Sequence, residues 1–275
     1  MVEHSRVRTT GAGGRTREHR EHRLRRQVLD PARHVAAFDL ENTLMASNVV
    51  VSYAWLATRR LPRDERLRFV LKTLAEAPGL LAMDRKDRGD FLRHFYRRYE
   101  GAPVEQLAED TVELSSQLLL NKAFPAGLRR VREHRALGHR TLLITGALDF
   151  VIDPIRPLFD DVVCASMSVQ LDGTWSGEMT DVPPTGESRA QALYDYCEAN
   201  GFDPGECVAY ADSSSDLPLL EAAGYPVAVN PETKLAAIAR SRGWLVERWE
   251  KAGGAPSPLL PIAPPRPRSL VRGRR

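Results

Sequence analysis

Three short apolar runs along the chain predict buried strands. They cover residues 35–38 (VAAF), 140–147 (RTLLITGA) and 206–211 (ECVAYA), and each leads within a few positions into polar residues. A continuous apolar run, in place of strict alternation, is typical of a strand that is covered on both faces in a parallel sheet. Segments with helical spacing separate the runs, so the pattern predicts an α/β fold built on a parallel sheet.

A long helical stretch interrupts this alternation between the first and second strands. Residues 49–122 show helical spacing of apolar residues and no strand-like alternation. Pro and Gly break the stretch at residues 61–62, 78–79 and 101–103. We therefore expect about four helices, inserted as a cap that covers the exit of the first strand. The sheet domain is expected to comprise residues 34–48 and 123–250.

Turn residues predict a hairpin in the second half of the chain. Asp172-Gly173 lies within LDGTWSGEM and is typical of a tight hairpin turn. Further helices are expected near residues 127–138, 151–159 and 188–201, with another short strand near 162–166.

The net charge of +3 is distributed unevenly. Residues 1–34 carry a net charge of +5 and residues 251–275 one of +6, which leaves −8 for the body between them. Composition predicts disordered basic tails over 1–33 and 251–275, although residues 16–29 (TREHREHRLRRQVL) could form a short basic helix. Such tails either make weak contact with an anionic membrane or serve as solvated linkers. No aromatic residues interleave the basic ones, so no specific nucleic-acid binding is expected.

Composition and cysteine usage bear on the compartment. No segment reaches the roughly 18 consecutive apolar residues of a membrane-spanning helix, and the first residues lack the apolar core of a signal peptide. Cys164, Cys197 and Cys207 are odd in number and show no metal-ligand spacing. We therefore expect a soluble, cytoplasmic protein whose cysteines are buried or free thiols.

Carboxylates and hydroxyls occur where the three predicted strands end. Asp39 follows the first strand, Thr145 lies at the end of the second, and Asp212 and Asp216 follow the third. The carboxyl ends of parallel strands lie side by side, so these side chains are expected to surround one crevice. A single Asp could instead cap a helix, but three converging carboxylates would repel one another without a cation. Oxygen ligands favour Mg²⁺, which we predict at this site.

The order and spacing of these residues resemble the haloacid dehalogenase superfamily, in its phosphoserine-phosphatase-like branch. The motifs are DLENT at residues 39–43, Thr145, a basic residue in TGESRAQAL, and DSSSD at 212–216 with the segment that follows it. The resemblance covers about residues 35–247. It implies a Rossmann-like core with an inserted helical cap that closes over substrate and excludes water. It also implies a Mg²⁺-dependent phosphomonoesterase that acts through an aspartyl phosphate.

The same resemblance implies roles for individual residues. Asp39 would be the nucleophile, and Glu41 would protonate the leaving oxygen and later activate water. Mg²⁺ would be held by Asp39, Asp212 and the backbone carbonyl of Glu41. Ser213 and Asp216 would support the metal shell. Phosphate oxygens would be bound by the Thr145 hydroxyl, the Gly146 amide and the Arg189 side chain.

Two positions depart from the family's pattern. Arg189 replaces the usual Lys, which keeps the positive charge and offers a bidentate fork to phosphate. Glu41 replaces the usual Asp. Its extra methylene adds about 1.5 Å of reach, which exceeds the ~0.5 Å tolerance expected of a catalytic arrangement.

Two functions of different classes follow from these observations. The first is hydrolysis of a small phosphorylated metabolite, which is either phosphoserine-like or an amphiphilic, lipid-like alcohol phosphate, since the cap is rich in apolar residues. The second is a phosphate- or partner-binding module in which Glu41 has disabled catalysis.

Overall fold

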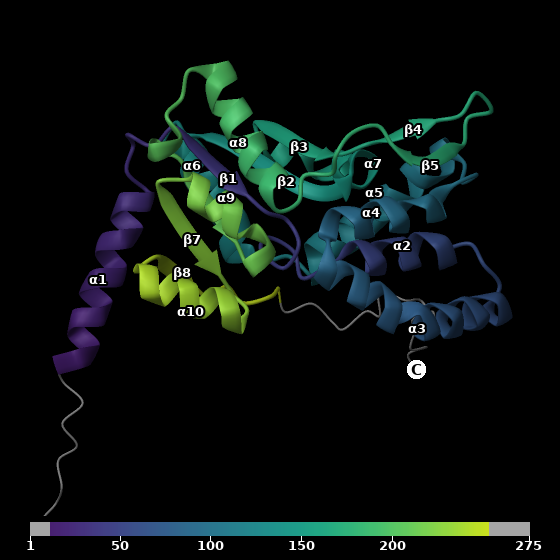
Figure 1. Ribbon diagram of the computed structural model, residues 1–275, viewed down its shortest axis with the longest axis horizontal. Helices are drawn as coiled ribbons and strands as arrows, with labels where there is room; N and C mark the ends of the chain where they lie inside the picture. The colour runs from purple at the N-terminus through teal and green to yellow at the C-terminus, as the bar shows by residue number, and fades with distance from the viewer. Residues whose placement is uncertain (1–11, 253–275) are drawn as a thin grey trace, which may run out of the picture.

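A parallel sheet of six strands forms the centre of the molecule. The computed structural model describes residues 12–252, in which helices cover both faces of the sheet and a helical cap lies beside it (Figure 1). The strand order is β3-β2-β1-β6-β7-β8, and every neighbouring pair is parallel. The strands are β1 Val35–Phe38, β2 Arg140–Leu148, β3 Asp161–Ala165, β6 Val208–Ala211, β7 Tyr225–Val229 and β8 Leu245–Glu247. This arrangement confirms the expected Rossmann-like α/β fold class.

Strand β1 lies between β2 and β6. All four of its residues are buried, and alternate residues join two different apolar clusters, one on each face of the sheet. Cover on both faces explains why the run is continuously apolar. Phe38 is in register with Leu143 of β2 and Tyr210 of β6, so the residue after Phe38 leaves the sheet between two neighbouring strands.

Helices join the strands and cover the sheet. One apolar cluster includes residues of α8 (Glu187–Asn200), α9 (Leu217–Ala222) and α10 (Thr233–Arg242), and the other includes residues of α6 (Pro125–Ala136) and α1 (Ala12–Val28). Shorter helical segments are α7 Asp149–Ile152 and the 3₁₀ turns η2 Asp153–Leu158, η3 Pro204–Glu206 and η4 Ser214–Asp216. Crossover connections of this kind are what parallel strands require.

Four helices form the cap, at the right of Figure 1. They are α2 Val49–Thr58, α3 Arg63–Lys86, α4 Arg88–Tyr96 and α5 Val104–Asn121, with the 3₁₀ turn η1 Arg97–Tyr99. An antiparallel hairpin of β4 Met167–Val169 and β5 Trp175–Met179 packs on it, and the Gly101 amide donates to the Trp175 carbonyl at 2.9 Å. One continuous apolar cluster includes buried residues of both the cap and the sheet, which fixes the cap against the sheet.

The expected helix break at residues 78–79 is wrong, because α3 runs through it. Pro78 lacks an N–H, and this removes one hydrogen bond from the helix. It lies on an exposed part of α3, where water can bind the freed carbonyl. Leu80 is the only buried residue of α3, so few tertiary contacts oppose a small distortion there.

Residues 12–28 form helix α1, where a disordered tail over 1–33 was expected. The basic helix considered for residues 16–29 corresponds to this element. Val28 is buried, and Nε of Arg25 donates to Oε1 of Glu247 at 3.1 Å, so the helix is attached to the last strand of the sheet. Residues 1–11 and 253–275, on which most of the remaining tail prediction falls, lie outside the described residues.

The three cysteines are free thiols, as expected. Within residues 12–252, no helix combines the length and apolar character needed to cross a membrane.

Candidate active site

Asp39 leaves β1 into a tight turn. Its amide donates to the Tyr210 carbonyl of β6 at 3.0 Å, and only 1% of the residue is exposed. Asn42 adopts a left-handed backbone with φ of 57°, and its amide donates to the Met45 carbonyl at 2.6 Å. Asn tolerates this conformation better than most residues. The strand therefore ends directly after Phe38, with the carboxylate of Asp39 at its exit.

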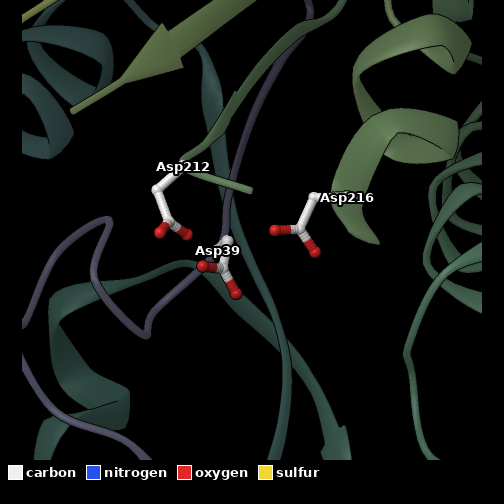
Figure 2. A group of neighbouring side chains, drawn as sticks. All are labelled: Asp39, Asp212 and Asp216. Carbon is white, nitrogen blue, oxygen red and sulfur yellow. The ribbon is translucent and has the colours of Figure 1, made fainter. Parts of the chain in front are cut away.

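Three carboxylates converge at the exits of β1 and β6 (Figure 2). Asp39, Asp212 and Asp216 each offer one oxygen, and these oxygens lie within 4.8 Å of one another. Burial raises the pKa of Asp212 to about 8, and repulsion by Asp39 and Asp216 adds to the rise. A cation would relieve this repulsion. Because all three donors are oxygens, the cluster fits Mg²⁺.

Arg189, in the first turn of α8, contacts two of these carboxylates. Its Nη1 lies 2.7 Å from Oδ1 of Asp39 and also binds Oδ1 of Asp216. Its Nε donates to the Pro184 carbonyl at 2.9 Å, and only 4% of the residue is exposed. Burial raises the pKa of Asp39 to about 7, even though Arg189 opposes the rise. One guanidinium therefore compensates only part of the negative charge.

The loop after β6 is fixed by hydrogen bonds. Ser213 Oγ donates to Oδ2 of Asp216 at 2.7 Å. The Ser214 amide donates to Oε1 of Glu232 at 2.8 Å, and the Glu232 amide donates to the Asp212 carbonyl at 3.0 Å. Glu232, which sequence reasoning missed, thus fixes the loop that carries Asp212. It lies after β7, so it reaches this loop only through the sheet topology.

Glu41 is paired with an arginine of the cap. Nη2 of Arg88, the first residue of α4, donates to Oε2 of Glu41 at 3.3 Å. The Glu41 side chain is 9% exposed and that of Arg88 25%. Sequence reasoning missed Arg88, because the two residues lie 47 positions apart and no motif distinguishes Arg88 from the other arginines of the cap.

Thr145 and Gly146 lie in β2 and do not line the crevice at the carboxylates. Thr145 is fully buried, and its hydroxyl accepts from the Ala147 amide at 3.1 Å. The Gly146 carbonyl accepts from the Tyr96 hydroxyl at 2.7 Å. A Cβ on Gly146 would lie 2.7 Å from Cδ1 of Leu92, so glycine allows α4 to approach β2 closely. The phosphate contacts expected of these two residues stay a prediction.

A crevice of about 530 Å³ opens at the three carboxylates. This volume falls within the roughly 300–1,000 Å³ of small-molecule sites. Its charged lining residues are Asp39, Glu41, Asp84, Asp212, Asp216 and Glu232, with Arg85, Arg88, Arg189 and Lys234. The formal charges of these residues leave an excess of two negative charges, which one divalent cation would neutralise. Sequence reasoning also assigned no role to Arg85, which lies outside every motif, or to Lys234, which lies in the segment after DSSSD.

Comparison with known proteins identifies the family. Residues 36–221 match the haloacid dehalogenase-like hydrolases. A probable phosphatase of Mycobacterium tuberculosis is 30% identical over 220 residues, which cover 78% of this chain and 75% of the relative. A histidinol-phosphatase of Neisseria meningitidis serogroup C is 28% identical over 229 residues, which cover 78% of this chain and 98% of the relative.

A solved structure shares the fold. It is a phospho-aspartyl intermediate analogue of phosphoserine phosphatase, with a TM-score of 0.55 and 17% identity over 74% of this chain and 90% of that one. The family match spans more than half of the chain and contains Asp39, Glu41 and Asp212. This protein therefore belongs to the haloacid dehalogenase-like hydrolase family, as its motifs predicted.

Proposed function

We propose that this protein is a Mg²⁺-dependent phosphomonoesterase that acts through an aspartyl phosphate on Asp39. The observation that carries the proposal is that the buried Asp39, Asp216 and Arg189 share one cluster with the half-buried Asp212. A carboxylate nucleophile, oxygen ligands for a cation and a guanidinium suited to phosphate thus lie in one site. Relatives named as phosphatases support the proposal.

The residues of this chain divide the reaction into two steps. In the first, an oxygen of Asp39 attacks phosphorus, and the bond between phosphorus and the alcohol oxygen breaks. Glu41 donates the proton that converts the leaving alkoxide to an alcohol. In the second, Glu41 takes a proton from water as that water attacks the aspartyl phosphate, which releases phosphate and restores Asp39. Proton transfer of this kind typically contributes about 10²–10⁴-fold to the rate.

The acidic cluster would hold the metal ion. Asp39, Asp212 and the backbone carbonyl of Glu41 are the proposed ligands, with Asp216 and Ser213 supporting them. When bound, Mg²⁺ would neutralise charge on the phosphoryl oxygens. The groups proposed for binding those oxygens are the Arg189 side chain, the Thr145 hydroxyl and the Gly146 amide.

Cavity volumes favour a small polar ester over a lipid-like one. The crevice at Asp39 has a volume of about 530 Å³ and a largely charged lining. Glu41 also lines a second, mainly apolar cavity with Met45, Leu118 and Ile152, whose volume is only about 20 Å³. One water molecule needs roughly 10–15 Å³ on this measure. The apolar cavity therefore has no room for an acyl chain, and we assign a phosphoserine-like ester to the charged crevice.

Phosphate release by the purified protein tests this function. The substrates are phosphoserine, histidinol phosphate and a long-chain alcohol phosphate, each with Mg²⁺ and with EDTA. We expect Mg²⁺-dependent release from a small polar ester and little from the long-chain one. No release from any ester with Mg²⁺ would contradict the proposal, and faster release from the long-chain ester would contradict the substrate class.

Substitutions of Glu41 test the alternative of a disabled binding module. If Glu41 is the working acid and base, Glu41→Asp and Glu41→Ala should both slow turnover, and Ala should slow it more. If Glu41 has disabled an ancestral enzyme, Glu41→Asp should restore the usual reach. A Glu41→Asp variant roughly tenfold faster than the wild type, about 1.4 kcal/mol in barrier, would favour the binding module.

A further inference from the structure

We infer that Arg88 of the cap is a positioning residue for Glu41 and sets its carboxylate for proton transfer. The inference rests on the proposed function and deepens it. Nη2 of Arg88 donates to Oε2 of Glu41 at 3.3 Å. Oε1 of Glu41 makes no hydrogen bond with another group of residues 12–252, so it is the oxygen available for proton exchange.

Arg88 is itself held in place within the cap. Its Nη1 donates to Oδ1 of Asp84, near the end of α3, at 2.7 Å. Its guanidinium carbon lies 5.6 Å from the ring centre of Phe91, one turn along α4. Asp87 caps the first turn of α4 with its side chain, which fixes the backbone from which Arg88 projects. The guanidinium therefore presents a defined donor to Glu41.

A glutamate at this position requires such support. Glu has one more rotatable bond than Asp, and a free side chain would sample several rotamers in a crevice of about 530 Å³. Proton transfer needs a heavy-atom separation of roughly 2.6–3.2 Å. A fixed cation that binds one carboxylate oxygen restricts where the other can lie. The pair thus explains how Glu41 can act where the family usually has Asp.

The pair also links the cap to the chemistry. Arg88 belongs to α4 and Glu41 to the turn after β1, so the contact requires the cap to lie as it does here. Both side chains are mostly buried, at 25% and 9% exposed, so solvent screens the pair only in part. The cap position that covers the site is therefore also the one that places Glu41.

Two esters with different leaving groups separate positioning from a general loss of activity. Glycerol 2-phosphate releases an alkoxide that needs a proton, whereas p-nitrophenyl phosphate releases a stable anion that needs little assistance. In the full-length protein with saturating Mg²⁺, Arg88→Met should lower kcat/KM for glycerol 2-phosphate about 10- to 100-fold. For p-nitrophenyl phosphate, the change should stay below about threefold. Arg88→Lys keeps a donor and should recover part of the loss.

A double-mutant cycle tests whether Arg88 acts through Glu41. In the Glu41→Ala background, Arg88→Met should change kcat/KM for glycerol 2-phosphate less than about twofold, because the group that it positions is gone. Arg93→Met is the matched control. Arg93 lies on the same helix and pairs with Asp90 at 2.9 Å, and it does not line the crevice, so wild-type rates are expected.

Three outcomes would overturn the inference. Equal losses on both esters would assign Arg88 to substrate binding or to folding, and a lowered thermal midpoint of Arg88→Met would identify folding. If the losses of kcat/KM in Arg88→Met and Glu41→Ala multiply in the double variant, Arg88 does not act through Glu41. A wild type that hydrolyses neither of these esters, nor phosphoserine or histidinol phosphate, with Mg²⁺ would overturn the proposed function, and this inference with it.

Discussion

Nη1 of Arg189 lies 2.7 Å from Oδ1 of Asp39 and also contacts Asp216, so the proposed nucleophile shares its cation with a second carboxylate. All three side chains are at most 5% exposed. A cation held between two buried carboxylates lowers their mutual repulsion and fixes their orientation. The same guanidinium has the geometry to bind phosphate oxygens.

Replacing Arg189 should therefore affect both activity and stability. Arg189→Met leaves Asp39 and Asp216 without their cation, so kcat/KM should fall at least about 100-fold. Without Mg²⁺, the free energy of unfolding should fall by about 3–5 kcal/mol, and added Mg²⁺ should restore part of it. Arg189→Lys should be intermediate in both respects. Urea unfolding and steady-state kinetics measure these effects, and wild-type kcat/KM in Arg189→Met would contradict the proposed role.

Removing one proposed metal ligand should remove Mg²⁺ binding and activity together. Asp212→Asn keeps the size of the side chain but deletes the charge that a hard cation prefers. Titration calorimetry should show Mg²⁺ affinity at least about tenfold weaker than in the wild type. Glu198→Gln is the matched control, because it also removes one carboxylate but lies on the exposed side of α8. This variant should bind Mg²⁺ as tightly as the wild type. Unchanged affinity in Asp212→Asn would place the metal elsewhere.

The metal-free protein should lose stability as pH rises from about 4 to about 8. Burial raises the pKa of Asp39 to about 7 and that of Asp212 to about 8, from an ordinary value of 3.8. In this interval the folded state binds more protons than the unfolded state, so the free energy of unfolding falls with rising pH.

Urea unfolding in EDTA measures this trend. The stability of Asp212→Asn should fall less steeply with pH, because one of the two carboxyl groups with a raised pKa is gone. In the wild type, Mg²⁺ should make the decline less steep. Identical pH profiles for the wild type and Asp212→Asn would contradict the assignment.

The pattern of apolar and polar residues predicted most of the fold, and each strand that it missed has a local cause. The runs at residues 35–38 and 140–147 became β1 and β2, because strands buried on both faces are continuously apolar. Strands β7 and β8 were not predicted. The first contains Pro226, which argues against a central strand, and the second has only three residues, too few to show a period.

The candidate site was partly predictable for a different reason. Asp39, Asp212 and Asp216 follow strands, and parallel topology brings strand ends together, so their convergence follows from position along the chain. Arg88 and Glu232 reach the crevice through the packing of α4 and the order of the sheet. No residue spacing in the sequence predicts either contact.

The charged ends of the chain should be dispensable for chemistry. Residues 253–275 carry five arginines and no acid, and no proposed site residue lies outside 12–252. A protein truncated to residues 12–252 retains α1 and its contact with Glu247, so it should keep kcat/KM on phosphoserine within about twofold. If the ends bind anionic membranes, sedimentation with anionic vesicles should be weaker for the truncated protein, and high salt should abolish the difference. Equal sedimentation of the full-length and truncated proteins at low salt would indicate that these ends act only as linkers.

Covalent capture of phosphate on Asp39 is the central claim, and Asp39→Asn tests it most directly. The amide has nearly the same shape as the carboxylate but is a poor nucleophile, so the variant should fold and lose turnover. Beryllium fluoride with Mg²⁺ mimics a carboxyl phosphate and should raise the thermal midpoint of the wild type alone. Mass spectrometry of acid-quenched turnover should find phosphate on the peptide that contains Asp39. Turnover by Asp39→Asn close to that of the wild type, or phosphate trapped on another residue, would contradict the account.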